Sequence, residues 1–105
     1  MSREDPGGAG LDGFAPAFHQ PVRLQIGAVL SNVSEAEFAR LREIAGVADS
    51  VLSKHLSALA DAGFVKLRKA PFEGRQRTWA TITPAGRRAF ADHVDALRRL
   101  AGEAV

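Results

Sequence analysis

The sequence predicts a mostly α-helical α+β domain with a three-helix core, one β-hairpin and a long final helix. Three observations predict it. Apolar residues recur at helical spacing in segments that end at Gly46 and Gly63. Two alternating, β-prone segments follow, on either side of a charged turn that contains Gly74. Thr83 and Pro84 then open a last helical stripe. Helices joined by a tight glycine turn, followed by strand, basic turn and strand, form a winged helix-turn-helix.

Length and composition limit the class of protein. A chain of 105 residues suits one domain with a real core. Apolar residues make up 46% and charged residues 25% of it, as in ordinary globular proteins. Cysteine is absent from the sequence, which excludes disulfides and thiolate metal sites and suits a reducing cytoplasm. The N-terminus has no signal pattern, and no apolar run approaches ~18 residues. We therefore expect a cytoplasmic protein that does not enter a membrane.

The chain is expected to divide into a flexible tail at 1–13 and a winged helix domain at 14–105. Pro6 and the glycines at 7, 8, 10 and 13 lower the propensity for helix and strand in the tail. Leu11, Phe14 and Phe18 are apolar exceptions, and we expect a short segment there that docks on the domain or on a partner chain. The first helix is expected to begin at Pro21, because proline is well tolerated at the first helical position. Its apolar stripe comprises Val22, Ile26, Val29 and Leu30.

The helix-turn-helix follows. We expect a short extended piece at 31–33 and a second helix from Ser34, where Ser34 and Glu37 have the spacing of a capping box. Gly46 is expected to end that helix, Asp49 to cap the third helix at about 49–62, and Gly63 to close it. The expected buried residues are Phe38, Leu41, Ile44 and Ala45 in the second helix and Leu52, Leu56, Leu59 and Ala60 in the third.

Two strands and a long helix complete the predicted fold. Phe64–Lys69 and Arg77–Thr83 are expected as strands, with Pro71 ending the first and Ala70–Gln76 forming the loop between them. The last helix is expected from Pro84 to about residue 101. Its apolar stripe is too long for a small domain to bury alone, and it comprises Phe90, Val94, Leu97, Leu100 and Ala101.

Positive charge is concentrated in the second half of the chain. Residues 1–63 contain 5 Lys/Arg and 8 Asp/Glu, a net charge of −3, whereas residues 64–105 contain 9 and 4, a net charge of +5. The strands, the wing and the last helix therefore form a basic region suited to a polyanion.

Three segments resemble a known family. They are HQPVRLQIGAVL at 19–30, LREIAGVADSVLSKHLSALADAGFV at 41–65 and GRQRTWATITPAGRRAF at 74–90. In this order and spacing they resemble compact winged helix regulators of the multiple-antibiotic-resistance (MarR) and arsenic-resistance (ArsR) superfamily, over about four fifths of the chain. The resemblance implies a dimeric transcriptional regulator whose third helix enters the major groove while the wing reaches the flanking backbone or minor groove. Metal sensing is not carried over, because the cysteine and histidine clusters of the metal-sensing branch are missing here.

Candidate DNA contacts lie on the third helix and on the wing, about 69–77. Small hydroxyls and one lysine on the outer helix face suit close approach to bases and phosphates, although an ordinary solvated face is the alternative. No Arg, Asn or Gln stands on that face, so we expect modest specificity. Basic wing residues suit phosphates or a narrow minor groove, with a charged, solubilising hairpin as the alternative. The candidates are Ser50, Val51, Ser53, Lys54, Ser57, Lys69, Arg75 and Arg77.

Other residues are interpreted mainly as structural or as weaker candidates for DNA contact. His55 is interpreted either as a structural histidine or as a DNA contact, and Trp79 as a packing residue of the wing. Lys66, Arg68, Arg87 and Arg88 are weaker candidates for backbone contact. His19 and His93 lack the spacing of metal ligands, so no metal or cofactor is expected. Without a Cys/His pair or a phosphate-binding glycine loop, an enzyme is not expected.

We therefore expect a sequence-specific transcriptional regulator that binds double-stranded DNA at an inverted repeat. The candidates for homodimerisation are Phe14, Phe18, Phe90, Val94, Leu97 and Leu100. A module for protein–protein assembly without productive DNA binding is the alternative. A small-molecule effector of unknown identity is a third partner that the composition permits, in a cleft between the wing domain and the dimer helices.

Overall fold

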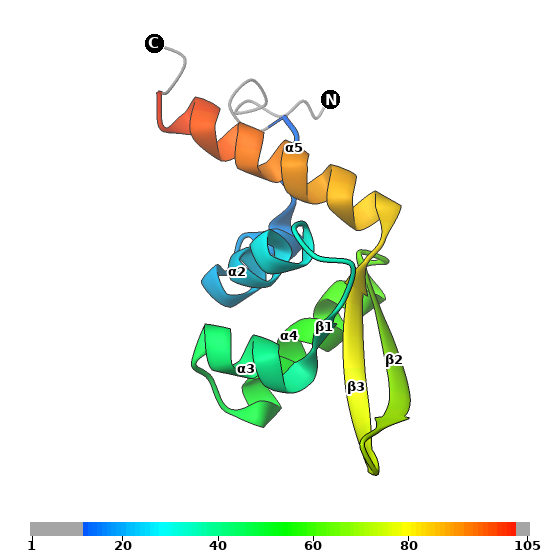
Figure 1. The fold of residues 1–105 in the computed structure, drawn as a ribbon. Helices are drawn as coiled ribbons and strands as arrows, with labels where there is room; N and C mark the ends of the chain where they lie inside the picture. Colours follow the sequence, from blue (N-terminus) through cyan, green and yellow to red (C-terminus); the bar gives the residue numbers. More distant parts are fainter. Residues whose placement is uncertain (1–11, 103–105) are drawn as a thin grey trace.

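The computed structural model describes residues 12–102 and shows a three-stranded sheet packed among helices (Figure 1). The tail residues 1–11, Leu11 among them, and residues 103–105 lie outside the described part, so the expected flexibility of the tail is not tested. The elements are η1 (Pro16–Phe18), α2 (Pro21–Leu30), β1 (Ala36–Glu37), α3 (Phe38–Ala45), α4 (Asp49–Asp61), β2 (Val65–Phe72), β3 (Arg75–Ile82) and α5 (Pro84–Leu100).

The starts of α2 and α5 were predicted correctly. Pro21 is the first residue of α2, and the side-chain oxygen of Gln20 accepts hydrogen bonds from the amides of Val22 at 2.7 Å and Arg23 at 3.2 Å. Pro84 is the first residue of α5, and the Thr83 hydroxyl accepts from the Gly86 amide at 2.9 Å. Each cap satisfies first-turn amides that have no partner within the helix.

The predicted start of the second helix was wrong. Residues 31–34 form turns, not an extended piece, and α3 begins at Phe38 with Glu37 in the N-cap position and no side-chain cap. Ala36 and Glu37 instead form strand β1, paired with Ala80 and Trp79 of β3. The backbone groups of Ala36 and Glu37 find partners in β3, so these residues stay extended and the helix begins after them. This pairing with β3 overrides the capping-box signal of Ser34 and Glu37.

The helix-turn-helix itself is confirmed. Gly46 ends α3 in the left-handed region at φ +66°, and α4 follows after two further residues. The expected cap is shifted by one residue, because Ala48 holds the N-cap position and Asp49 is the first helical residue. The inward residues Leu52, Leu56 and Leu59 of α4 are fully buried.

The wing is longer and its turn tighter than predicted. The sheet order is β1-β3-β2, and β2 and β3 pair continuously from Val65↔Ile82 to Phe72↔Arg75. The predicted loop shrinks to Glu73 and Gly74, with φ of 51° and 77°, as a two-residue hairpin turn requires. Pro71 does not end the strand, because β2 is an edge strand of the described sheet and tolerates a residue without an N–H.

The core lies between the helices and the sheet, and it includes Phe18. The Phe18 ring is fully buried, stacks on Phe64 at 5.3 Å and meets Phe90 edge-on at 5.3 Å. Phe18 was expected on a dimer surface, but the structure places it inside the protomer. The other large buried residues are Ile26, Leu30, Leu41, Leu52, Leu56, Leu59 and His93.

The molecule is elongated, with two distinct ends. Its extents are 54 × 28 × 23 Å, with α5 at one end and α3, α4 and the tip of the β2–β3 hairpin at the other (Figure 1). Within the described residues, no helix combines the length and apolar character needed to cross a bilayer.

Candidate nucleic-acid interface

The outer face of α4 carries all five helix residues predicted to contact DNA. Leu52, Leu56 and Leu59 fix which side of the helix is buried, and the opposite side is therefore held at the surface. The five residues on that surface, all exposed, are Ser50, Val51, Ser53, Lys54 and Ser57. The sequence pattern was sufficient here because one buried leucine stripe determines the orientation of the whole helix.

Serines of α4 meet the wing along a small groove. Ser53 and Ser57 line a groove of about 290 Å³ together with Leu67, Lys69 and Thr78. Lys69 and Thr78 are opposite each other in the β2–β3 ladder, so both stand on the sheet face that looks toward α4. Two predicted helix residues and one predicted wing residue are thereby brought together, and two hydroxyls and an ammonium suit a phosphate.

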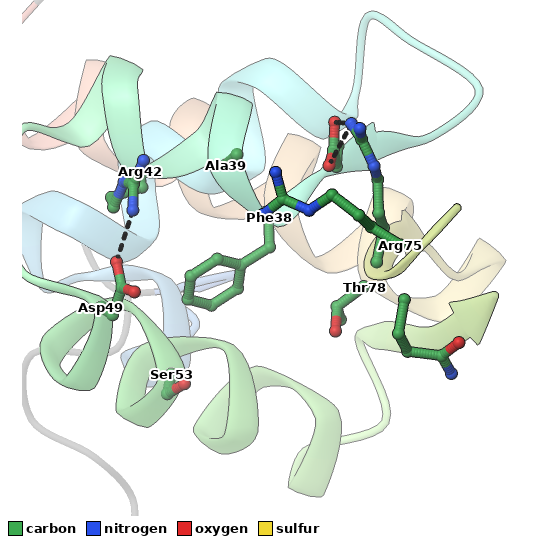
Figure 2. A pocket seen from close by; sticks show the side chains of 10 residues that line it. Phe38, Ala39, Arg42, Asp49, Ser53, Arg75 and Thr78 are labelled. Carbon is green, nitrogen blue, oxygen red and sulfur yellow. Dashed lines mark hydrogen bonds and ion pairs between the residues drawn. The ribbon is translucent and has the colours of Figure 1, made fainter. Parts of the chain in front are cut away.

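A larger cleft separates the helix-turn-helix from β3. It has a volume of about 620 Å³, and Figure 2 shows Phe38, Arg42, Asp49 and Ser53 on the helical side and Arg75 and Thr78 on the strand side. Its lining is rich in charged and hydroxyl side chains, and it includes Asp49 and Ser53 of α4. A cleft of this chemistry accommodates a charged backbone better than an apolar ligand.

Arg77 is bound to an acidic partner within the protein. Its guanidinium donates to both carboxylate oxygens of Glu37, at 3.2 and 3.0 Å, and lies 5.2 Å from the Phe72 ring centre. The two side chains are only 23% and 22% exposed, so the pair is partly shielded from water. Arg77 thereby ties the wing to β1, and its predicted DNA contact would have to compete with Glu37.

Three other predicted cations are uncompensated. Lys54, Lys69 and Arg75 are exposed, and within residues 12–102 none of them makes a hydrogen bond or ion pair. Lys54 stands on the outer face of α4, Lys69 on β2 and Arg75 at the start of β3, so they surround the two grooves. Their charges remain available to a polyanion.

Several other arginines have internal partners. Arg68 contacts Glu35 at 2.7 Å, and Arg87 donates to the carbonyl oxygen of Ser31 at 2.8 Å. The Arg42–Asp49 ion pair, at 2.9 Å, bridges α3 and α4 across the Gly46 turn and was missed by the sequence reasoning. No helical spacing signals it, because the chain changes direction at the turn between the two residues.

His55 and Trp79 have structural surroundings. The His55 Nδ1 accepts a hydrogen bond from the Arg23 side chain at 3.0 Å. Burial, and then the positive charges of Arg23 and Lys54, lower the pKa of His55, so the neutral form is favoured. The Trp79 ring packs within the wing, edge-on to Phe72 at 6.2 Å and 5.8 Å from the Arg68 guanidinium. Among residues 12–102, no group of three side chains is arranged to hold a metal ion.

Comparison with known proteins identifies a family and a curated relative. A family model described as a winged helix DNA-binding domain matches residues 22–101. An uncharacterised protein of Methanocaldococcus jannaschii is 36% identical over 77 residues, which cover 73% of this chain and 84% of that protein.

Solved structures share the fold along most of the chain. A transcriptional regulator homologue from Pyrococcus horikoshii superposes with a TM-score of 0.76 at 25% identity, over 83% of this chain and 86% of its own. A MarR family transcriptional regulator from Silicibacter pomeroyi gives a TM-score of 0.64 at 21% identity, over 82% of this chain and 56% of its own.

Proposed function

Since the chain belongs to the winged helix DNA-binding domain family, we propose that it is a homodimeric, sequence-specific transcriptional regulator. The predicted winged helix fold is confirmed, and solved transcriptional regulators, among them a MarR family member, share that fold. Family and fold make the chain a DNA-binding protein of the regulator class, not an enzyme. The dimer, the operator and the contact residues are the proposed part.

In the proposed complex, α4 enters the major groove and the β2–β3 wing lies on the flanking backbone or minor groove. The observation that carries this arrangement is the placement of Lys54, Lys69 and Arg75, which are exposed and uncompensated around the helix–wing grooves. Neighbouring Arg42, Arg68 and Arg77 are paired with carboxylates. The positive potential is thus concentrated where helix and wing would meet phosphates.

The proposed dimer forms through α5 at the other end of the molecule. Val94 and Leu97 are half-buried within the protomer, and Leu100 is 51% exposed, so an apolar strip of α5 remains available. Phe14 and Phe90 are also half-buried near this end. A two-fold dimer places two copies of α4 on one face of the duplex, which predicts an inverted repeat with half-sites about one helical turn apart.

A small-molecule effector belongs to the same proposal. A shallow cleft of about 490 Å³ at the start of α5 has an apolar floor of Ile82, Pro84 and Ala91, with Arg87 and Arg88 beside it. Apolar surface next to two guanidinium groups suits a small organic anion. It lies between the wing and α5, so occupancy would alter the angle between the DNA-binding and dimer ends.

The test is selection of duplexes from a random library, followed by affinity measurements from about 50 to 200 mM salt. We expect selected duplexes to be bound more tightly than random DNA, with a steep salt dependence. Replacing Lys54, Lys69 and Arg75 with alanine should weaken binding and reduce the salt slope by ~0.9 for each lost phosphate contact. Arg99→Ala, at the α5 end, is the charge control and should leave the slope unchanged. Absence of DNA binding at low salt by a confirmed dimer would favour a protein-assembly module.

A further inference from the structure

The outer face of α4 is chemically divided along its length. Ser53 and Ser57 face the wing, where they line the groove with Lys69. Lys54 lies near the middle of the face, opposite the buried Leu52 and Leu56. At 3.6 residues per turn, Val51 falls on the other side of Lys54, away from the wing. The hydroxyls are therefore on the phosphate-binding side, and an apolar side chain occupies the far side.

Val51 is an exposed large hydrophobic residue on the outer face of α4. Its side chain is 39% exposed, and it is not part of the buried core cluster or of the partly buried residues packed against it. A β-branched residue on an exposed helical surface loses rotamer freedom and is a weaker helix former than alanine or a long polar residue. An aliphatic side chain exposed on the outer face of α4 is therefore available for a contact outside the protomer.

The position of Val51 puts it among base edges in the proposed complex. It lies in the first turn of α4, which begins at Asp49, and the N-terminal residues of a recognition helix approach the bases most closely. No Arg, Asn or Gln stands on the outer face to form bidentate hydrogen bonds with guanine or adenine. Within the major groove, the complement of an exposed aliphatic side chain is the C5-methyl group of thymine.

We propose that Val51 is a specificity-determining residue that reads a thymine methyl group in each half-site. The inference rests on the proposed function, since it needs α4 in the major groove. Lys54 and the wing supply binding without reading this base, and Val51 supplies discrimination through a methyl–methyl contact that excludes water.

The experiment compares one selected duplex made in two forms, with thymine or with deoxyuridine at each thymine of the half-sites. Deoxyuridine keeps the base pair and removes only the methyl group. We expect the wild-type protein to bind the deoxyuridine form about fourfold more weakly per half-site, the effect of one buried methyl group. Val51→Ala should bind both forms equally, whereas Val51→Ile should retain discrimination.

Val33→Ala is the matched control. Val33 is 41% exposed and lies in the turn region before β1, so the same change at similar exposure should leave thymine discrimination intact. Equal wild-type affinity for both duplexes, selected half-sites without thymine, or discrimination that persists in Val51→Ala would each overturn the inference. These outcomes are distinct from failure of the proposed function, which is absence of salt-sensitive DNA binding altogether.

Discussion

Arg75 and Arg77 show how the environment separates two residues of the same type. They are two positions apart on β3 and therefore stand on the same face of the sheet. Glu37 of β1 reaches Arg77 but not Arg75, because β1 is paired only with Ala80 and Trp79. Arg77 is consequently a stabilising contact of the wing, and Arg75 is a free charge at the turn.

We expect the two alanine variants to change different properties, DNA binding for Arg75 and stability for Arg77. Arg75→Ala should leave the melting temperature unchanged, weaken DNA binding and lower the salt slope by ~0.9 for each half-site, about 1.8 for the bound dimer. Arg77→Ala should reduce the free energy of unfolding by about 1–2 kcal/mol, since it leaves the partly buried Glu37 carboxylate without its partner. Chemical denaturation and a salt titration of both variants check this. A large loss of stability in Arg75→Ala would contradict the assignment.

His93 is a buried titratable residue that links α5 to the N-terminal segment. Its Nδ1 accepts a hydrogen bond from the Ala15 amide at 2.9 Å, and its ring is fully buried beside Phe14. Burial, and secondarily the nearby His19, lower the pKa of His93 below its ordinary 6.5. Protonation would turn Nδ1 into a donor facing a donor, so the folded protein holds the neutral form.

This geometry predicts loss of stability in mild acid. With the folded pKa below the unfolded pKa, the unfolded chain binds the extra proton as pH falls below about 6.5, and the free energy of unfolding decreases. Above that pH the contribution is fully present. His93→Asn does not titrate and should flatten the dependence between pH 7 and pH 5 in urea unfolding at fixed protein concentration. His55→Asn is the control, because His55 is the other histidine whose pKa is lowered. If His93→Asn left the pH dependence of the free energy of unfolding unchanged, the role of His93 would be refuted.

At the scale of elements, α5 depends on a close backbone approach at Gly86. A Cβ atom there would lie 2.1 Å from the Phe64 carbonyl oxygen, which itself accepts a hydrogen bond from the Thr83 amide. The neighbouring atoms are backbone, so they do not move aside as a flexible side chain would. Gly86 therefore fixes how the first turn of α5 sits on the start of the wing.

Gly86→Ala should destabilise the fold by about 2 kcal/mol through this overlap. The sign of the change in the free energy of unfolding is informative. Where a helix surface is unobstructed, replacing glycine with alanine stabilises the helix by up to about 1 kcal/mol. Denaturant midpoints of the variant and of Ala91→Gly, an exposed change in the same helix, separate the overlap from helix propensity. A gain in stability for Gly86→Ala would show that helix and wing are not held this closely.

Elements with a local cause were predictable from sequence, and those with a tertiary cause were not. The caps at Gly46 and Thr83 and the leucine stripe of α4 are set by neighbours in the chain. Strand β1 exists only because β3 lies beside it, so Ser34 and Glu37 gave a false capping signal. The continuation of β2 through Pro71 likewise depends on its position at the sheet edge.

In the candidate interface, too, some features have a local cause and were predictable, whereas others depend on tertiary contacts and were not. Exposure of the α4 residues followed from the leucine period, and the structure places all five at the surface. Which wing cations are free did not follow, because Glu35 and Glu37 are more than thirty residues before Arg68 and Arg77 in the chain. Phe18 was misplaced for a related reason: its aromatic neighbours Phe64 and Phe90 are distant in sequence and adjacent in space.

At the scale of the whole molecule, the elongated shape separates two tasks. Helix α4 and the tip of the β2–β3 hairpin lie at one end, and α5 lies at the other (Figure 1). The uncompensated Lys54, Lys69 and Arg75 belong to the first end, and the exposed Leu100 belongs to the second. A change at the α5 end therefore alters assembly without touching the DNA-facing residues. That separation makes the proposed dimer testable through its effect on DNA binding.

Leu100→Glu is the variant that tests it. Leu100 is 51% exposed, so a charge there should leave the protomer folded but should oppose burial against a second copy. We expect sedimentation or light scattering to show a shift from dimer to monomer. Because two half-sites are bound cooperatively only by a dimer, affinity for a two-half-site duplex should fall much more than affinity for a single half-site. Val33→Glu, at 41% exposure in the turn region before β1, is the matched control and should remain dimeric. If Leu100→Glu also remained dimeric and bound the full site normally, assembly would have to use a surface other than the end of α5.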